Sequence, residues 1–415
     1  MANAQDAPHR GGRPTYATPE GRWKALLSIA FLHFLNDLHP TLLPTFLPEI
    51  VKRLSLSLGQ AGFLSTLFGI LNLLVQPLAG HFADKREEPT FALWSPLFTA
   101  GGAYLLPIAP NYGVAMLFVG MMGVGTAGFH PQGHGLTGVA GGEDKLGAYL
   151  AIFAAAGTLG SALSPLYAVL LLRTLGASYM PFALLPLLCA ILAARRFLPV
   201  RQHEPDPAAP AAACGETGAG GGFFASTFRV LMLCLPLVLI AIVRDSTSQG
   251  IRVFLPLLVT GRGGSLEMGG SVLFAFTVAG SAANLVGGKL ADMFGKHRVI
   301  VAMLLLAPIF LFPAVWAQGP SSIVLFVCGG ACIAATNPIT LAMAQERVPG
   351  SRSTASSLVM GVSWGIANIV ASPIGMLADR IGLTRALGLV ALSPLVVVAA
   401  LLLHAIAARL RRGKA

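Results

Sequence analysis

The stretch Gly288-Lys-Leu-Ala-Asp-Met-Phe-Gly-Lys-His-Arg298 stands where one long apolar run ends and the next begins. Each residue type in it suits a short turn between two helices at a membrane surface. Gly288 lets two helix backbones approach closely, and Gly295 permits a tight turn. The basic residues Lys296 and Arg298 are typical of a cytoplasmic loop. The stretch therefore predicts a turn between two membrane-spanning helices.

The same pattern occurs 208 residues earlier, in Gly80-His-Phe-Ala-Asp84-Lys-Arg86, where Asp84 aligns with Asp292. The offset also aligns residues far from this loop. These pairs are Asp37 with Asp245, Phe46-Leu-Pro48 with Phe254-Leu-Pro256, Gly157 with Gly365 and Ser164-Pro165 with Ser372-Pro373. Such agreement without a net gap indicates a duplicated unit, and internal repeats are typical of transporters.

The composition of the chain is that of a membrane protein. Hydrophobic residues make up 55% of its 415 residues and charged residues only 11%, whereas soluble domains carry about a quarter charged residues. Apolar runs of about 20 residues, each long enough to cross a bilayer, recur along the chain. We therefore predict an all-α integral membrane protein whose twelve spans lie roughly at 24–47, 58–82, 91–109, 112–136, 146–172, 178–198, 228–258, 268–290, 298–316, 321–344, 354–378 and 384–408.

The predicted spans divide the chain into two bundles of six helices joined by a linker. Twenty lysine and arginine residues lie on the side of the termini and linker and six on the other side, so both termini are expected in the cytoplasm. The net charge of +11 lacks the aromatic-interleaved basic patches of nucleic-acid binders, and no nucleic acid is expected. The segments are a disordered cytoplasmic N-terminus at 1–22, bundles at 23–198 and 228–408, a flexible cytoplasmic linker at 199–227 and a basic cytoplasmic tail at 409–415.

Twelve spans in two halves, each with the Gly-x-x-Ala-Asp loop after its second span, resemble the major facilitator superfamily of transporters. The resemblance implies a monomer with two pseudo-symmetric bundles, in which spans 1, 4, 7 and 10 line a central cavity. Two shorter motifs, His33-Phe-Leu-Asn36-Asp37 and Phe129-His130-Pro131, look like the fosmidomycin-resistance branch of drug exporters. An acidic residue often follows the proline in that branch, where this chain has Gln132. The resemblance implies export from the cytoplasm across the inner membrane.

Ionisable groups at membrane depth are costly, so each is a candidate functional residue. His33 and Asp37 lie one helical turn apart in the first span, and His130 and His134 one turn apart in the fourth. We predict that Asp37 is a proton-coupling residue and that His33 and His130 relay its proton or hold the substrate once the proton leaves. Movement of the two halves would change the burial of Asp37, which would then load and release a proton. The alternative is that His33 and Asp37 form a structural pair packed against another helix.

The seventh span carries two arginines, Arg244 and Arg252, beside Asp245 and Gln249. Exposure of an arginine to lipid would cost at least ~2.5 kcal/mol, so each must face a cavity or an acidic partner. Their charge suits an anionic substrate. The alternative is that Arg244 only bonds Asp245 or Asp37 and holds the halves together. The residues predicted to contact substrate are Asn36, Asp37, Phe129, His130, His134, Arg244, Asp245, Gln249, Arg252, Asn337, Trp364 and Asn368.

The duplicated loops predict gates at the cytoplasmic surface. Asp84 is expected at the positive end of the eleventh span, near Ser353, and Asp292 at that of the fifth span, near Gly147. These contacts would hold the cytoplasmic side closed. The residues predicted to form the gates are Gly80, Asp84, Lys85, Gly288, Asp292, Lys296 and Arg298.

The sequence favours a secondary transporter that exchanges a small organic compound for protons. Transport of a transition-metal ion or metal complex is the alternative, because His33, Asp37, His130 and His134 are residue types that bind such ions. An enzyme is disfavoured, because the chain has no nucleophile elbow, phosphate-binding loop or zinc signature. We expect no cofactor and no resident metal. His39 lies nearer a predicted helix end and is expected at the membrane surface.

Overall fold

The computed structural model describes residues 19–84, 88–198 and 223–412. Lys85 and most of the predicted linker at 199–227 therefore lie outside the described residues. The side chains of Asp84 and Ser353 and the surroundings of Gly147 also lie outside them, although the backbone of all three residues is helical.

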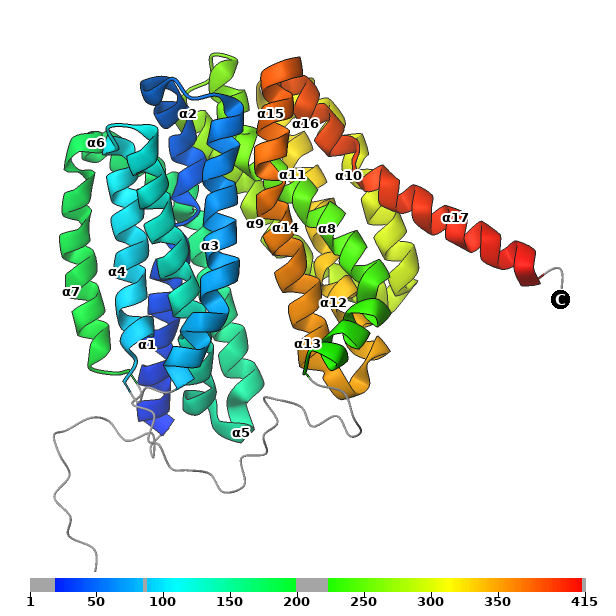
Figure 1. The fold of residues 1–415 in the computed structure, drawn as a ribbon, viewed down its shortest axis with the longest axis horizontal. Coiled ribbons are helices and arrows are strands. Elements are labelled where there is room, and N and C mark those ends of the chain that lie inside the picture. The colour runs from blue at the N-terminus through cyan, green and yellow to red at the C-terminus, as the bar shows by residue number, and fades with distance from the viewer. Residues whose placement is uncertain (1–18, 85–87, 199–222, 413–415) are drawn as a thin grey trace, which may run out of the picture.

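The first half of the chain forms the helices that Figure 1 draws from blue to green. They are α1 (Pro19–Leu38), α2 (Leu42–Leu54), α3 (Leu58–Asp84), α4 (Thr90–Leu105), η1 (Leu106–Ile108), α5 (Tyr112–Thr174), α6 (Gly176–Tyr179), η2 (Met180–Ala183) and α7 (Leu184–Arg195).

The second half continues the helical architecture. Its elements are α8 (Phe223–Gly261), α9 (Leu266–Phe294), α10 (Lys296–Trp316), α11 (Pro320–Ala335), α12 (Asn337–Arg347), η3 (Pro349–Ser351), α13 (Arg352–Ser357), the π-helix η4 (Leu358–Val362), α14 (Ser363–Ile369), α15 (Ala371–Ile381), α16 (Leu383–Leu392) and α17 (Pro394–Arg412).

Twelve helical segments of the described chain are long and apolar enough to cross a membrane, which confirms the predicted number. Several consist of two helices, because proline interrupts the backbone hydrogen bonds. The first span joins α1 and α2 around Pro40, and the tenth joins α11 and α12 at Asn337-Pro338. In contrast, the single long helix α5 contains two spans, Tyr112–Gly141 and Ala148–Thr174.

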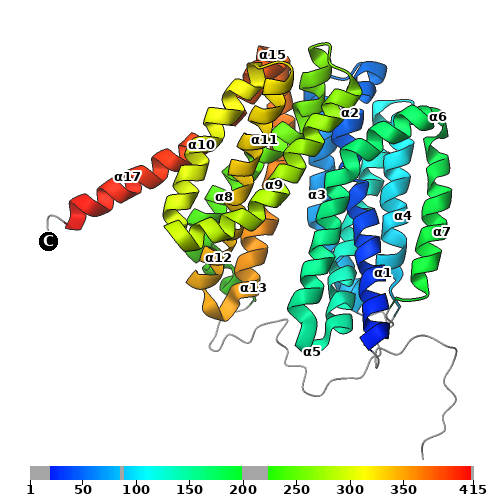
Figure 2. The same cartoon turned by 180° about the vertical axis from the view of Figure 1, so that it is seen from behind.

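The spans form two bundles that stand side by side in both views (Figures 1 and 2). Elements α1–α7 make up one bundle and α8–α17 the other, and this arrangement confirms the predicted fold class. We call the surface at which α3 and α7 end the linker face, and the surface at which α2 and α15 end the opposite face. Helix α17 points away from its bundle, following the break at Ser393-Pro394.

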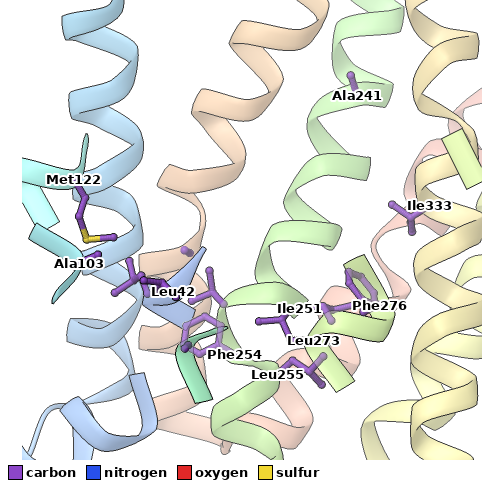
Figure 3. Close-up of a cluster of buried hydrophobic side chains, with 14 of the residues drawn as sticks. Leu42, Ala103, Met122, Ala241, Ile251, Phe254, Leu255, Leu273, Phe276 and Ile333 are labelled. Atoms are coloured by element: carbon purple, nitrogen blue, oxygen red, sulfur yellow. The ribbon is translucent and has the colours of Figure 1, made fainter. Parts of the chain in front are cut away.

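The core of the molecule is apolar and extends through both bundles. Figure 3 shows part of it, where Phe254 of α8 lies toward Leu42 of α2 while Ile251 lies toward Leu273 of α9. Phe46 and Phe254, which the 208-residue offset aligns, are 1% and 0% exposed. The duplicated Phe-Leu-Pro motif therefore places an equivalent aromatic anchor in each half.

The described hydrogen bonds between the two halves join segments near the opposite face. Along α3 and the α14–α15 segment, the Thr66 hydroxyl donates to the Asn368 carbonyl oxygen at 2.9 Å. One turn earlier on α3, a Cβ on Gly62 would collide with the backbone of Ala371, so this glycine lets the two helices touch. The halves are thus closely packed from the opposite face toward the middle of the membrane.

Candidate functional site

Three side chains from two helices converge in the first bundle. Asp37 lies one turn beyond His33 on α1, and its Oδ2 is 3.1 Å from His33 Nε2. His130 of α5 approaches the other carboxylate oxygen, with Nε2 3.4 Å from Oδ1. The side chains of His33 and Asp37 are only 7% and 19% exposed. We call these three residues the His-Asp-His triad.

The second ring nitrogen of each histidine bonds a backbone carbonyl. His33 Nδ1 lies 2.7 Å from the oxygen of Phe153, and His130 Nδ1 lies 2.9 Å from that of Thr126. A carbonyl oxygen only accepts, so both Nδ1 atoms must carry hydrogen. A neutral ring would then turn a bare Nε2 toward Asp37. Each contact between Nε2 and the carboxyl group therefore needs a proton of its own, on the ring or on the acid.

The surroundings of the triad fix its geometry. The His33 ring is stacked 3.9 Å from the ring of Phe153 and 5.4 Å from that of Phe129, measured between centroids. Gly157 lets the second part of α5 pass close by, because a Cβ there would lie 2.7 Å from Asp37 Oδ2. The triad is thus held between aromatic rings and a glycine, with little room for other rotamers.

Asn36 extends the polar network of the triad, whereas Gln132 bonds the backbone at the start of α4. Asn36 is fully buried, donates to Asp37 Oδ1 at 3.1 Å and lies 3.3 Å from the Thr99 hydroxyl. Gln132 accepts from the backbone N–H of Ala92 at 2.8 Å and donates to the Glu88 carbonyl oxygen at 3.1 Å. It therefore secures the start of α4.

His134 stands apart from the triad. Its ring meets the edge of Phe153 at 4.8 Å between centroids, it is exposed, and it makes no hydrogen bond within the described part of the chain. Among the described residues, one group has ligand atoms close enough together to hold a metal ion, and it consists of His33, Asp37 and His130, whose atoms lie within 4.8 Å of one another.

The second bundle carries a different acid–base pair at the mirrored position. Arg244 is 1% exposed and donates two hydrogen bonds, of 2.8 and 2.9 Å, to the carboxylate of Asp245. Its remaining nitrogen donates to the Thr340 hydroxyl at 2.7 Å, and Asp245 accepts from the Ser363 hydroxyl at 2.6 Å. Of the two predicted partners, Arg244 therefore bonds Asp245. Thr340 and Ser363 were not predicted, because a lone hydroxyl in a span carries no sequence signal.

The other predicted contacts in this bundle lie along α8 and α14. Gln249 donates to the Asn368 side chain at 3.0 Å, and Asn368 in turn donates to the Trp364 carbonyl oxygen at 2.9 Å. The Trp364 side chain is exposed. Arg252 differs from Arg244, because its Nε is buried and lacks a hydrogen-bond partner among the described residues. Asn337 begins α12, and its carbonyl oxygen accepts from Thr340.

The predicted gating residues lie at the linker face. Gly80 faces Pro131, and a Cβ on Gly288 would meet open space. Asp292 and Arg298 are exposed, while Lys296 forms an ion pair with Glu346. Asp84 ends α3, but its side chain lies outside the described residues, as does Lys85.

His39 is fully buried rather than at the membrane surface, so that prediction is wrong. Its Nδ1 donates to the Leu35 carbonyl oxygen, and its Nε2 lies 2.8 Å from the Tyr104 hydroxyl. That hydroxyl lies 2.8 Å from the hydroxyl of Tyr167. Tyr104 thus satisfies the second ring nitrogen of His39 inside the bundle. The position of His39 along the span does not reveal this partner.

In the described part of the chain, twelve apolar helical segments in two bundles, with ionisable groups paired between them, are typical of a multi-pass membrane protein. The chain belongs to the Major Facilitator Superfamily, whose family model matches residues 29–372 and 237–414. This membership confirms the predicted family and makes the protein a transporter rather than an enzyme.

Two relatives cover nearly the whole chain. The chain is 26% identical to the fosmidomycin resistance protein of Escherichia coli (strain K12), across 94% of this chain and 95% of the relative. It is 28% identical to the uncharacterized MFS-type transporter YfnC of Bacillus subtilis (strain 168), across 91% and 92%. The predicted likeness to the fosmidomycin-resistance branch is therefore confirmed.

Solved transporter structures have the same fold. A bacterial homolog of the human lysosomal transporter Spinster superposes with a TM-score of 0.77 at 15% identity, covering 92% of this chain and 96% of that chain. The nucleoside transporter NupG superposes with a TM-score of 0.70 at 14% identity, covering 91% and 98%.

Proposed function

We propose that the protein is a proton-coupled antiporter that exports a small organic compound, and that the His-Asp-His triad is its proton-binding site. One observation carries this proposal. Both Nδ1 atoms are committed to backbone carbonyls, so the two contacts between the histidines and Asp37 hold together only when protons lie between them. Protons bound between Asp37 and the two histidines would therefore hold these contacts together.

Coupling would follow from alternating access. With the triad protonated, its charges are paired and the first bundle packs around it. When the halves move and water reaches the triad, Asp37 and the imidazoles can exchange their protons with that side of the membrane. Histidine is suited to this role, because its charge changes near neutral pH. Protons would enter from the periplasm and leave toward the cytoplasm.

The direction of transport and the substrate class rest on the relatives and on charge. The E. coli relative is named for resistance to fosmidomycin, so fosmidomycin is the natural first test compound, and resistance favours export. In the second bundle, a buried nitrogen of Arg252 has no hydrogen-bond partner among the residues that the structure describes, whereas Arg244 is paired with Asp245. We therefore propose an anionic substrate that binds Arg252, with Gln249, Asn368 and Trp364 as further contact residues.

The proposal also includes the orientation in which the linker face is cytoplasmic, because lysine and arginine are concentrated there. The test uses everted inner-membrane vesicles, in which a pH-sensitive dye reports an imposed gradient. Addition of fosmidomycin should dissipate the gradient in vesicles that contain the wild-type protein. Vesicles that contain Asp37→Asn should show no such effect at equal protein levels. Dissipation by the variant as large as by the wild type would contradict the proposal.

A second candidate function is transport of a transition-metal ion, which the spacing of the three triad ligands favours. The ion would be the substrate, held by Nε2 of both histidines and by Asp37. Proteoliposomes loaded with a metal-sensitive dye separate the two functions. Entry of Zn²⁺ or Ni²⁺ that His130→Gln abolishes would support metal transport, and dissipation of the pH gradient by fosmidomycin without metal entry would support the first function.

A further inference from the structure

The eight-residue pattern that ends α9 occurs a second time, at the other membrane face. Gly288-Lys-Leu-Ala-Asp-Met-Phe-Gly295 and Gly375-Met-Leu-Ala-Asp-Arg-Ile-Gly382 agree at both glycines and at the Leu-Ala-Asp core. Both final glycines have positive φ, 90° at Gly295 and 86° at Gly382, and each directly precedes a new helix. The two stretches thus build the same turn, one at the linker face and one at the opposite face.

The copy at the opposite face touches the other half of the molecule. The carboxylate of Asp379 accepts the backbone N–H of Leu58 at 2.7 Å and that of Gly59 at 2.8 Å. These two groups belong to the first turn of α3, which leaves them without partners inside their own helix. A carboxylate at this position also meets the positive end of the helix dipole.

The backbone around this contact is shaped to allow it. A Cβ on Gly375 would lie 2.9 Å from the Cα of Gly59 and would collide with the Leu58 carbonyl group. A Cβ on Gly59 would meet Asp379 Oδ2 at 3.0 Å. Ser57 completes the cap, because its hydroxyl accepts the N–H of Gln60 at 3.1 Å. The end of α15 and the start of α3 therefore fit each other closely.

The mirrored position in the molecule carries a contact of another kind. The 208-residue offset relates Leu58 to Leu266 at the start of α9. There Ser265 provides the cap, and Glu267 pairs with Arg173 of α5 across the halves at 2.6 Å. The Arg173 side chain is 67% exposed, so solvent weakens this pair. Asp379 is exposed as well, but it bonds two fixed backbone groups and loses less side-chain freedom in doing so.

We propose that Asp379 is a gating residue, which latches the two halves together at the opposite face and lets go when the transporter opens there. Asp292, in the same turn at the linker face, is exposed and accepts no hydrogen bond and forms no ion pair within the described part of the chain. The two copies of the turn are therefore in different states in one structure. Alternating access requires one conformation closed at the opposite face and one closed at the linker face. Asp379 would hold the first closed, and Asp292 would hold the second closed.

The test measures distances across each face in detergent, without substrate or pH gradient, so its result is independent of the proposed function. Spin labels are placed in a background from which the five native cysteines have been removed. Labels at Ser178 and Gln318 report the opposite face, and labels at Arg196 and His297 report the linker face. Asp379→Ala removes both acceptors, whereas Asp379→Asn keeps one neutral acceptor.

In Asp379→Ala the population open at the opposite face should rise about three- to tenfold relative to the closed one, as expected for loss of two charge-assisted bonds at a helix end. Asp379→Asn should give a smaller rise, and Arg173→Gln less than Asp379→Ala. Asp292→Asn is the matched control and should not open the opposite face. Unchanged distances in folded Asp379→Ala, or equal opening by Asp292→Asn, would overturn the proposal. A lower melting temperature without a shift in distances would also overturn it, because it would assign Asp379 a purely structural capping role.

Discussion

Replacement of Asp37 by asparagine should uncouple transport from the pH gradient and leave the fold intact. Asparagine has the same shape, and its amide group can donate to one bare imidazole nitrogen where the carboxylate needed an intervening proton. The packing around the site, including Gly157 and the stacked rings, is unchanged. We therefore expect a loss in unfolding free energy of only about 1–3 kcal/mol.

The electrostatic consequence is larger than the structural one. A carboxylate and a protonated imidazole 3.1 Å apart attract each other by roughly 5 kcal/mol at an effective dielectric constant near 20, before desolvation is subtracted. The neutral amide removes this attraction for both histidines. Without the carboxylate, the proton affinity of the site should no longer differ between the two conformations.

The assay compares two modes of transport in proteoliposomes with labelled fosmidomycin. In the first, a gradient of one pH unit supplies about 1.4 kcal/mol for each proton exchanged, enough for about tenfold accumulation of substrate. Wild-type protein should reach this accumulation, and Asp37→Asn should not exceed equilibration. In the second, labelled and unlabelled substrate exchange without a gradient, and the variant should still perform this exchange.

The matched control is Asp245→Asn, which removes the acid that the 208-residue repeat places opposite Asp37. Asp245 is held by the guanidinium group of Arg244 rather than by histidine side chains. The control variant should therefore lose stability but retain accumulation driven by the pH gradient. Tenfold accumulation by Asp37→Asn would refute the reasoning and would make Asp37 a structural partner of the histidines.

Three further predictions address the surroundings of the candidate site. Arg244→Gln should lower the unfolding free energy by about 3–5 kcal/mol, because it leaves the Asp245 charge buried without its partner, and thermal unfolding in detergent measures this loss. Gly157→Ala should lower the unfolding free energy by about 1–3 kcal/mol and reduce transport, because the added methyl group collides with the triad. In the control Gly135→Ala, the added methyl group meets no described atom within 4 Å, so its thermal unfolding and transport should match those of the wild type. Arg252→Gln should abolish the thermal stabilisation that fosmidomycin gives the wild type while the unliganded melting temperature stays within about 2 °C, and retained stabilisation would exclude Arg252 as the anion-binding group.

The fold could be predicted from the sequence because it depends on two local features, the apolar runs and the internal repeat. Apolar runs of bilayer length specify the spans, since unpaired backbone groups are not tolerated in lipid and each run must be helical. The 208-residue repeat then specifies that the spans form two equivalent bundles. Pro40 and Asn337-Pro338 also indicate where spans break, although a break does not reveal which neighbouring group fills the gap.

The partners of the candidate residues could not be predicted, because they depend on contacts between distant helices. His33 Nδ1 bonds the carbonyl group of Phe153, 120 residues away, and every residue type has such a carbonyl. Thr340 and Ser363 bind Arg244 and Asp245 through hydroxyls that are common in spans. His39 shows the same limit, since distance along the helix does not say that Tyr104 lies beside it.

The second copy of the glycine-framed turn was present in the sequence but fell outside the repeat. Gly375 to Gly382 lies 87 residues beyond Gly288 to Gly295, not 208, and it ends a span that runs in the opposite direction. The 208-residue offset relates only turns that lie on the same membrane face, such as those at Asp84 and Asp292. The chemistry of a turn does not depend on that face, because a helix N-terminus attracts a carboxylate wherever the two meet.

The duplication gave the two bundles equivalent helices, but the aligned acids Asp37 and Asp245 have different partners in the two bundles. At the mirrored positions of α1 and α8, Asp37 and Asp245 are retained, but Asn36 is replaced by Arg244 and His33 by Ala241. The acid in the first bundle faces two bases whose charge changes with pH, whereas the acid in the second faces a base of fixed charge. Under the proposed function, the histidine-paired acid is the one that responds to a proton gradient, whereas Asp245 forms a buried ion pair with Arg244. Under the proposed function, the triad drives transport only if its affinity for protons differs between the two conformations, since a ligand that binds both states equally shifts no equilibrium.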